Sequence, residues 1–204
     1  MTARAGHAGF PRFLPHYVQR DFLPTEMADA LIDYAVANEA RFGPSATLYE
    51  GQRMVDPDFR TAVNLGDLGP FTQPLTDRIA EIRPILEKAL GIPSYPLARL
   101  ELDLTASGDG SYFVRHVDTA LGKARTAQTR MVTMALYLHR RPRRFVGGAL
   151  RLFALGGPEV VEIPPDHNML ASFPAFTPHE VERVSCPGGS FADARFAVTI
   201  SLLR

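Results

Sequence analysis

The spacing of apolar residues changes near residue 97, and this change limits the folds that the chain can adopt. Before it, two stretches place apolar residues three or four positions apart, as helices do when they bury one face. After it, apolar and polar residues alternate in short segments separated by Gly, Pro and Asp, which is typical of strands. Helices followed by a run of strands predict an α+β fold around an antiparallel sandwich or barrel.

The two expected helices lie at about 25–42 and 71–90. Thr25 is the candidate N-cap of the first, which should end at Gly43, and Gly91 is the expected stop of the second. Pro84 falls inside the second pattern and predicts a kink or two shorter helices. The apolar stripes consist of Ala28, Leu31, Ile32 and Ala35 in the first helix and of Leu75, Ile79, Ile82, Leu86 and Leu90 in the second.

The segment 97–105 has one apolar and one charged face, which predicts a half-buried strand. The apolar face holds Ala98, Leu100, Leu102 and Leu104, and the charged face holds Arg99, Glu101 and Asp103. Further strands are expected at 112–118, 130–138, 147–153, 160–163, 169–173, 179–185 and 195–203, with a short one around 16–18.

The length of 204 residues fits a single domain, with a mainly helical support region at about 13–95 and a strand-rich core at about 96–204. Basic and acidic residues number 22 each, and this balance argues against a general nucleic-acid binder or a membrane-surface protein. Cys186 is the one cysteine, so no internal disulfide can form. The sequence has no run typical of a signal peptide or a membrane span, and we expect a cytoplasmic protein.

A histidine and an aspartate lie two positions apart in an expected strand, at His116 and Asp118. Residues at this spacing point to the same face of a strand, so both could bind one ion. A second histidine, His179, follows a proline-rich turn and starts another expected strand; taken by itself, it is better interpreted as a surface residue at a turn. Two histidines and one carboxylate form the facial triad that suits non-heme Fe(II), with part of the coordination sphere left open.

Arg195 begins a strand that is otherwise apolar, and a buried arginine needs an anion. One interpretation is a salt bridge to the acids nearest in sequence, Asp193, Glu182 or Glu180. The other is a guanidinium that binds a carboxylate of a small diacid. Tyr137, on the strand 130–138, could donate a hydrogen bond to the same carboxylate, or it could be a core aromatic residue.

Five segments together resemble the 2-oxoglutarate- and Fe(II)-dependent dioxygenases, and within them the prolyl-4-hydroxylase-like branch. The segments are GSYFVRHVD at 110–118, RMVTMALYL at 130–138, GGALRLF at 147–153, PHEV at 178–181 and RFAVTI at 195–200. Their order matches the family, and they cover about half of the chain. The sequence departs from the family where relatives often carry a tyrosine before the HxD motif, since Leu104, Thr105 or Ala106 stands there.

The resemblance implies a double-stranded β-helix, also called a jelly roll, with supporting N-terminal helices. It implies that His116, Asp118 and His179 bind Fe(II). Arg195 would hold the distal carboxylate of 2-oxoglutarate beside Tyr137. It also places Thr199 in the same pocket and Arg130 near the substrate opening.

The expected activity is hydroxylation of a C–H bond with dioxygen and 2-oxoglutarate, with ascorbate as an auxiliary reductant that the resemblance allows. A prolyl or other protein side chain is the expected substrate, and a free amino acid or small metabolite is the alternative. Two other classes stay open: a jelly-roll protein that binds metal or anions without oxidation, and a cupin-type metal enzyme that uses no keto acid. In the cupin-type enzyme, Arg195 would pair with an internal acid.

Overall fold

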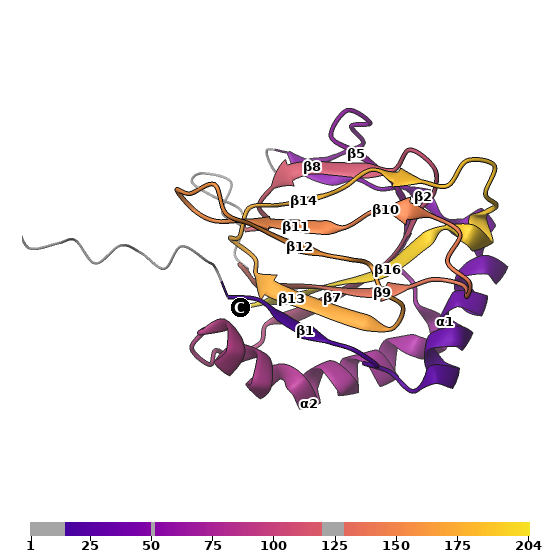
Figure 1. Cartoon of the computed structure of the whole chain (residues 1–204). Coiled ribbons are helices and arrows are strands. Elements are labelled where there is room, and N and C mark those ends of the chain that lie inside the picture. Colours follow the sequence, from indigo (N-terminus) through magenta and orange to yellow (C-terminus); the bar gives the residue numbers. More distant parts are fainter. Residues whose placement is uncertain (1–14, 50–51, 120–128) are drawn as a thin grey trace, which may run out of the picture.

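The computed structural model describes residues 15–49, 52–119 and 129–204, and two antiparallel sheets that face each other dominate it (Figure 1). The larger sheet, called the major sheet here, has seven strands, and the smaller one, the minor sheet, has five. Strands distant in sequence are neighbours in both sheets, as in a jelly roll. The fold is therefore the double-stranded β-helix that the family resemblance implies.

The strands of the major sheet are, in spatial order, β1 (Tyr17–Gln19), β13 (Met169–Pro174), β9 (Arg130–Leu138), β16 (Arg195–Leu203), β7 (Arg99–Ser107), β6 (Val63–Leu65) and β2 (Gly43–Pro44). Those of the minor sheet are β12 (Val160–Ile163), β11 (Leu150–Phe153), β14 (His179–Val181), β8 (Tyr112–His116) and β5 (Arg60–Thr61). Two small pairs complete the strands, β3 (Thr47–Tyr49) with β4 (Gln52–Met54) and β10 (Val146–Gly147) with β15 (Val184–Ser185).

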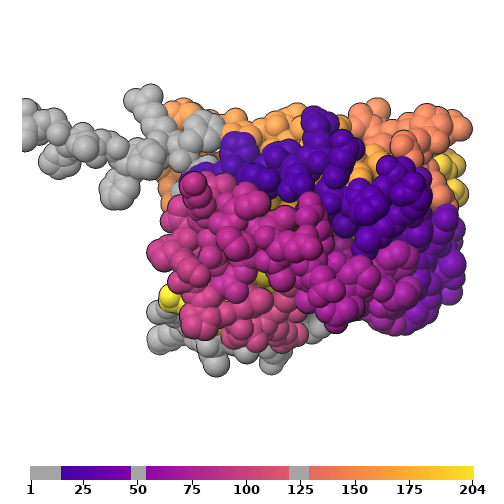
Figure 2. Space-filling view, turned by 90° about the horizontal axis from the view of Figure 1, so that it is seen from below, coloured from indigo at the N-terminus to yellow at the C-terminus, as the bar shows by residue number. Residues whose placement is uncertain are grey.

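Two long helices, α1 (Thr25–Ala37) and α2 (Thr72–Leu90), lie against the outer face of the major sheet and cover it when the molecule is viewed from below (Figures 1 and 2). The apolar stripes expected from the sequence are buried, and they pack against the outward side chains of the sheet. This packing holds the major sheet in place, and the sheet in turn positions the side chains on its inner face. In the ranges that the structure describes, no helix is long and apolar enough to span a membrane.

The structure corrects three details of these helices. Pro24 precedes the first helical residue, so Thr25 belongs to α1 and does not cap it. The helix ends at Ala37, before the expected end at Gly43, because a short 3₁₀ turn follows (Glu39–Arg41). The expected break at Pro84 into two helices is wrong, since α2 is continuous. Pro84 lies on the exposed face, where water can bond the freed carbonyl.

The N-terminal region contributes strands as well as helices. Strands β1, β2 and β6 extend the major sheet, and β5 pairs with β8 at the edge of the minor sheet. The short strand expected around 16–18 is confirmed as β1, but β2, β5 and β6, with two or three residues each, carry no alternation that a sequence pattern could reveal. The segment expected as one strand at 179–185 is also divided, into β14 and β15.

The inner faces of the two sheets enclose a small apolar core and a cavity of about 1180 Å³. The apolar core includes Leu150, Leu152, Ala171 and Phe173. The charged face expected on the segment 97–105 lines the cavity through Glu101 and Asp103. The polar side chains of the inner faces therefore surround a space that is large enough for small ligands.

Candidate active site

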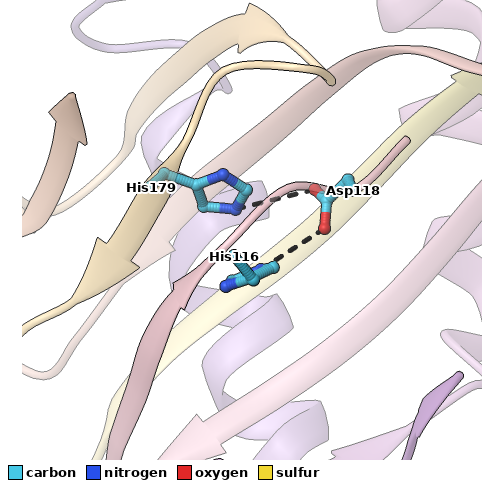
Figure 3. A group of neighbouring side chains, drawn as sticks. All are labelled: His116, Asp118 and His179. Atoms are coloured by element: carbon cyan, nitrogen blue, oxygen red, sulfur yellow. Dashed lines mark ion pairs between the residues drawn. The ribbon is translucent and has the colours of Figure 1, made fainter. Parts of the chain in front are cut away.

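His116, Asp118 and His179 meet in the cavity, as the sequence predicts (Figure 3). His116 ends β8, Asp118 follows two residues later, and His179 begins the neighbouring strand β14, directly opposite His116. The Nε2 atom of His116 lies 3.4 Å from Oδ1 of Asp118, and Nε2 of His179 lies 3.7 Å from Oδ2. One donor atom from each residue falls within 4.8 Å of the others.

Both imidazole rings are held in the orientation that a metal ligand needs. The Nδ1 atom of His116 lies 2.8 Å from the carbonyl oxygen of Val114, and Nδ1 of His179 lies 2.9 Å from that of Thr177. Each Nδ1–H therefore donates to a carbonyl, which leaves the Nε2 lone pair free. The Nε2 atom of His116 is buried and has no hydrogen-bond partner. An ion at this point would satisfy it.

The charges of the three groups also suit a metal. Burial alone would raise the pKa of Asp118, but the imidazoles of His116 and His179, 3.4 and 3.7 Å from its carboxylate oxygens, outweigh it and hold this pKa well below its usual range. Burial lowers the pKa of His179 to about 4, although Asp118 opposes the shift. At neutral pH the site thus offers an ionised carboxylate and a neutral His179 imidazole, the forms that bind metals. This set of two nitrogens and one oxygen fits non-heme Fe(II).

Aromatic rings and a hydroxyl pack around the triad. The ring of Phe113 stacks on His116, with the centroids 3.6 Å apart. Phe173 makes an edge contact with His179, at 4.6 Å between centroids. Thr133, on β9, donates a 2.6 Å hydrogen bond to Oδ2 of Asp118. Such outer contacts fix the orientation of metal ligands.

Arg195 and Tyr137 lie on the inner face of the major sheet, with only 4% and 1% of their surfaces exposed. The guanidinium carbon of Arg195 is 4.8 Å from the centroid of the Tyr137 ring. The Nε atom of Arg195 and the hydroxyl of Tyr137 are both buried without a hydrogen-bond partner. Burial lowers the pKa of Arg195 and raises the pKa of Tyr137. Both donors would be satisfied by an anion in the cavity.

The first interpretation of Arg195, a salt bridge to a nearby acid, is wrong. Among the residues that the structure describes, no carboxylate lies within 4.0 Å of its guanidinium nitrogens. The three candidate acids have other partners: Asp193 accepts hydrogen bonds from Ser190, Glu182 pairs with Arg151, and Glu180 lies near Arg151 and Arg115. The cation therefore has no compensating acid of its own, which counts against the cupin-type alternative.

Thr199 and Thr105 also line this cavity. Thr199 lies on β16, beside Ala135 of β9 and Asp103 of β7. Thr105 lies on β7, and its buried hydroxyl has no hydrogen-bond partner. Of the three residues that stand near the missing tyrosine, Thr105 is the one that faces the cavity, while Leu104 and Ala106 pack into the core under the helices.

Arg130 begins β9 at the cavity, where its guanidinium binds Glu101 of β7. The Nη2 and Nε atoms lie 2.8 and 3.2 Å from the same carboxylate oxygen. This ion pair gives Arg130 a structural partner, and its contact with a substrate stays a prediction.

Three residues of the site were not expected from the sequence. Thr133 shares a face of its strand with Tyr137, and this spacing could have indicated it. Gly148 has a φ of +73°, and a Cβ atom there would lie 2.7 Å from Cδ of Arg195, so the glycine makes room for the arginine. Arg60, from the turn-rich N-terminal region, also reaches the cavity, and nothing in the sequence around it indicates this.

Comparisons with known proteins agree with this geometry. A sequence profile of the 2OG-Fe(II) oxygenase superfamily matches residues 102–201. An uncharacterized PKHD-type hydroxylase of Synechocystis sp. is 34% identical over 132 residues, which are 61% of this chain and 43% of that protein. The chain thus spans less than half the length of this curated relative.

Solved structures show the same fold. A prolyl-4-hydroxylase of Pseudomonas putida superposes with a TM-score of 0.68 at 22% identity, covering 93% of this chain and 92% of that one. A prolyl hydroxylase of Trichoplax adhaerens, in complex with a peptide fragment of the oxygen degradation domain of hypoxia inducible factor, gives 0.70 at 19% identity, covering 93% and 83%. The chain belongs to the 2OG-Fe(II) oxygenase superfamily, and its fold is that of the prolyl-4-hydroxylase-like branch.

Proposed function

We propose that the protein is an Fe(II)- and 2-oxoglutarate-dependent dioxygenase that hydroxylates a C–H bond. One observation carries the proposal: a triad with free metal-binding atoms shares its cavity with an arginine and a tyrosine that lack partners. His116, Asp118 and His179 would hold Fe(II). Arg195 and Tyr137 would hold the distal carboxylate of 2-oxoglutarate.

When bound, iron and 2-oxoglutarate supply the oxidation: dioxygen is consumed, the keto acid becomes succinate and carbon dioxide, and the substrate carbon gains a hydroxyl. The chain supplies geometry and exclusion of water. Thr133 holds the Asp118 carboxylate in place, and the burial of Arg195 strengthens its attraction for a carboxylate. Thr199 lies on β16, between Asp103 of β7 and Ala135 of β9, and lines the cavity.

Two substrate classes follow from the resemblance. A prolyl or other protein side chain has the support of the solved prolyl hydroxylases with this fold, one of which holds a peptide. A free amino acid or small metabolite has the support of two charged residues in the cavity, Arg60 and Asp103, that have no oppositely charged partner within 4.0 Å among the described residues. The use of ascorbate and a cytoplasmic location stay predictions.

The proposal is tested by the oxygen-dependent conversion of 2-oxoglutarate to succinate, with and without added Fe(II). We expect slow succinate formation even without a substrate, and we expect Asp118→Ala to abolish both this turnover and Fe(II) binding measured by calorimetry. Asp77→Ala, on the exposed face of α2, is the matched control. Metal binding without succinate would favour a non-oxidative binding protein.

A further inference from the structure

Arg60 places a positive charge beside the proposed metal site. It lies on β5, at the edge of the minor sheet, and pairs with Phe113 of β8. Its guanidinium carbon is 4.8 Å from the centroid of the Phe113 ring, which in turn stacks on the ring of His116. Arg60 is half-buried and lines the cavity. The guanidinium can therefore contact a ligand that binds in the cavity next to the triad.

This charge has no direct partner in the part of the chain that the structure describes. No carboxylate there lies within 4.0 Å of the guanidinium nitrogens, and the side chain makes no hydrogen bond. Burial lowers the pKa of Arg60. The charge of Arg195 lowers this pKa further, whereas the more distant carboxylates of Asp118 and Asp103 raise it. A half-buried guanidinium left in this state attracts an anion.

Asp103 places a negative charge on the opposite wall. It lies on β7 of the major sheet, across from Thr199, and it lines the same cavity. Its Oδ1 atom accepts one hydrogen bond, from Nδ2 of Asn64 at 3.2 Å. Within the described ranges, no cationic nitrogen lies within 4.0 Å of it. Glu101, two residues earlier on the same face, is neutralised by Arg130, so Asp103 is the acid of this strand that remains available.

The balance of charges indicates what kind of substrate fits. With the cofactors of the proposed function in place, the iron dication, Arg60 and Arg195 face Asp118, Asp103 and the dianion of 2-oxoglutarate. Among these six groups the positive and negative charges are equal in number; Glu101 and the two arginines that it contacts, Arg99 and Arg130, also line the cavity. A substrate without net charge preserves this equality, and one that carries both signs can also pair with Arg60 and Asp103.

We propose that Arg60 and Asp103 form a subsite for a free α-amino acid, with Arg60 binding its carboxylate and Asp103 its ammonium group. The inference rests on the proposed function and names the substrate class of the same cavity. A guanidinium forms paired hydrogen bonds with a carboxylate, and an ammonium group donates to one. A residue inside a peptide has neither charge, so it would leave both side chains unpaired when it displaced their water.

The test uses the full chain loaded anaerobically with Fe(II) and 2-oxoglutarate, and it probes the common L-amino acids, proline included. Binding is followed by calorimetry and by the change in the absorbance of the chelated keto acid. At least one amino acid should bind, and its N-acetyl and carboxamide derivatives should bind about tenfold more weakly or worse. Arg60→Gln and Asp103→Asn should each weaken the free amino acid by a similar factor and leave the affinity for 2-oxoglutarate unchanged.

Arg115→Gln is the matched control, because this exposed arginine lies on the adjacent strand β8 and does not line the cavity. The subsite is refuted if the keto acid chelates and no free amino acid binds. It is also refuted if a peptide with an internal proline binds and Arg60→Gln leaves that affinity unchanged. Failure of the keto acid to chelate would instead count against the proposed function. If Arg60→Gln does not fold, the subsite is tested by the affinity of Arg60→Lys for the free amino acid and by the affinity of the unaltered protein for the N-acetyl and carboxamide derivatives.

Discussion

The hydroxyl of Thr133 donates a 2.6 Å hydrogen bond to Oδ2 of Asp118 and so joins the centre of the major sheet to the carboxylate of the candidate metal site. The backbone N–H of Asp118 is also fixed, by a 2.9 Å bond to the carbonyl of Ala175. Asp118 lies just beyond the end of β8, where strand pairing no longer holds it. These two hydrogen bonds therefore hold Asp118 in position in place of strand pairing.

Thr133→Val should therefore weaken Fe(II) binding by about 10–100-fold, the usual range for losing a contact of this kind. The shape of the side chain is kept, and the fold should be unaffected. Thr133→Ser retains the hydroxyl and should bind close to normally. Calorimetry with Fe(II) under nitrogen measures both variants, and equal affinity for Val and Ser would show that the bond does not orient the ligand.

Gly148 should affect the affinity for 2-oxoglutarate indirectly, through the position of Arg195. A Cβ atom at this position would lie 2.7 Å from Cδ of Arg195, so Gly148→Ala should displace the guanidinium and raise the Kd for 2-oxoglutarate. Gly156 is the control: it also has a positive φ, at +80°, but no atom lies within 4 Å of the position that an added methyl group would occupy. If both alanine variants change the Kd equally, backbone strain and not the contact with Arg195 is responsible.

The metal-free protein should lose stability as the pH falls from about 6.5 to about 4. Burial lowers the pKa of His179 from 6.5 to about 4, so in this range the unfolded chain binds the extra proton and acid favours unfolding. A shift of this size corresponds to roughly 3 kcal/mol in the free energy of unfolding. Urea unfolding with a chelator present, at neutral and acidic pH, measures it.

His179→Gln isolates this contribution, because burial also lowers the pKa values of His139 and His167 and they add to the same slope. The variant should show a smaller loss of stability between the two pH values. A loss as large as that of the unaltered chain would mean that His179 is not buried in neutral form.

The sequence predicts the candidate metal site well because local geometry brings it about. His116 and Asp118 lie at strand spacing, and His179 begins the strand that pairs with β8. Arg195 stands out because the strand around it is apolar. Asp118 itself lies beyond the end of β8, so its bonds to Thr133 and Ala175, which the pattern did not indicate, hold it in place.

Arg60 and Asp103 could not be recognised in the same way. Each looks like an ordinary surface charge in the sequence, one in a turn-rich region and one on the polar face of a strand. The two sheets bring them to one cavity, and Arg130 pairs with Glu101 rather than with Asp103. Which charges are neutralised depends on contacts between residues distant in sequence.

Anaerobic binding of Fe(II) and 2-oxoglutarate tests the central claim most directly. The weak charge-transfer absorbance of an iron-chelated keto acid should appear with the unaltered chain. Arg195→Ala should require a much higher 2-oxoglutarate concentration, by roughly 30-fold or more, since removing one partner of a buried charge pair costs about 2–5 kcal/mol. Metal binding without this absorbance, or an Arg195→Ala variant with unchanged affinity for the keto acid, would contradict the account.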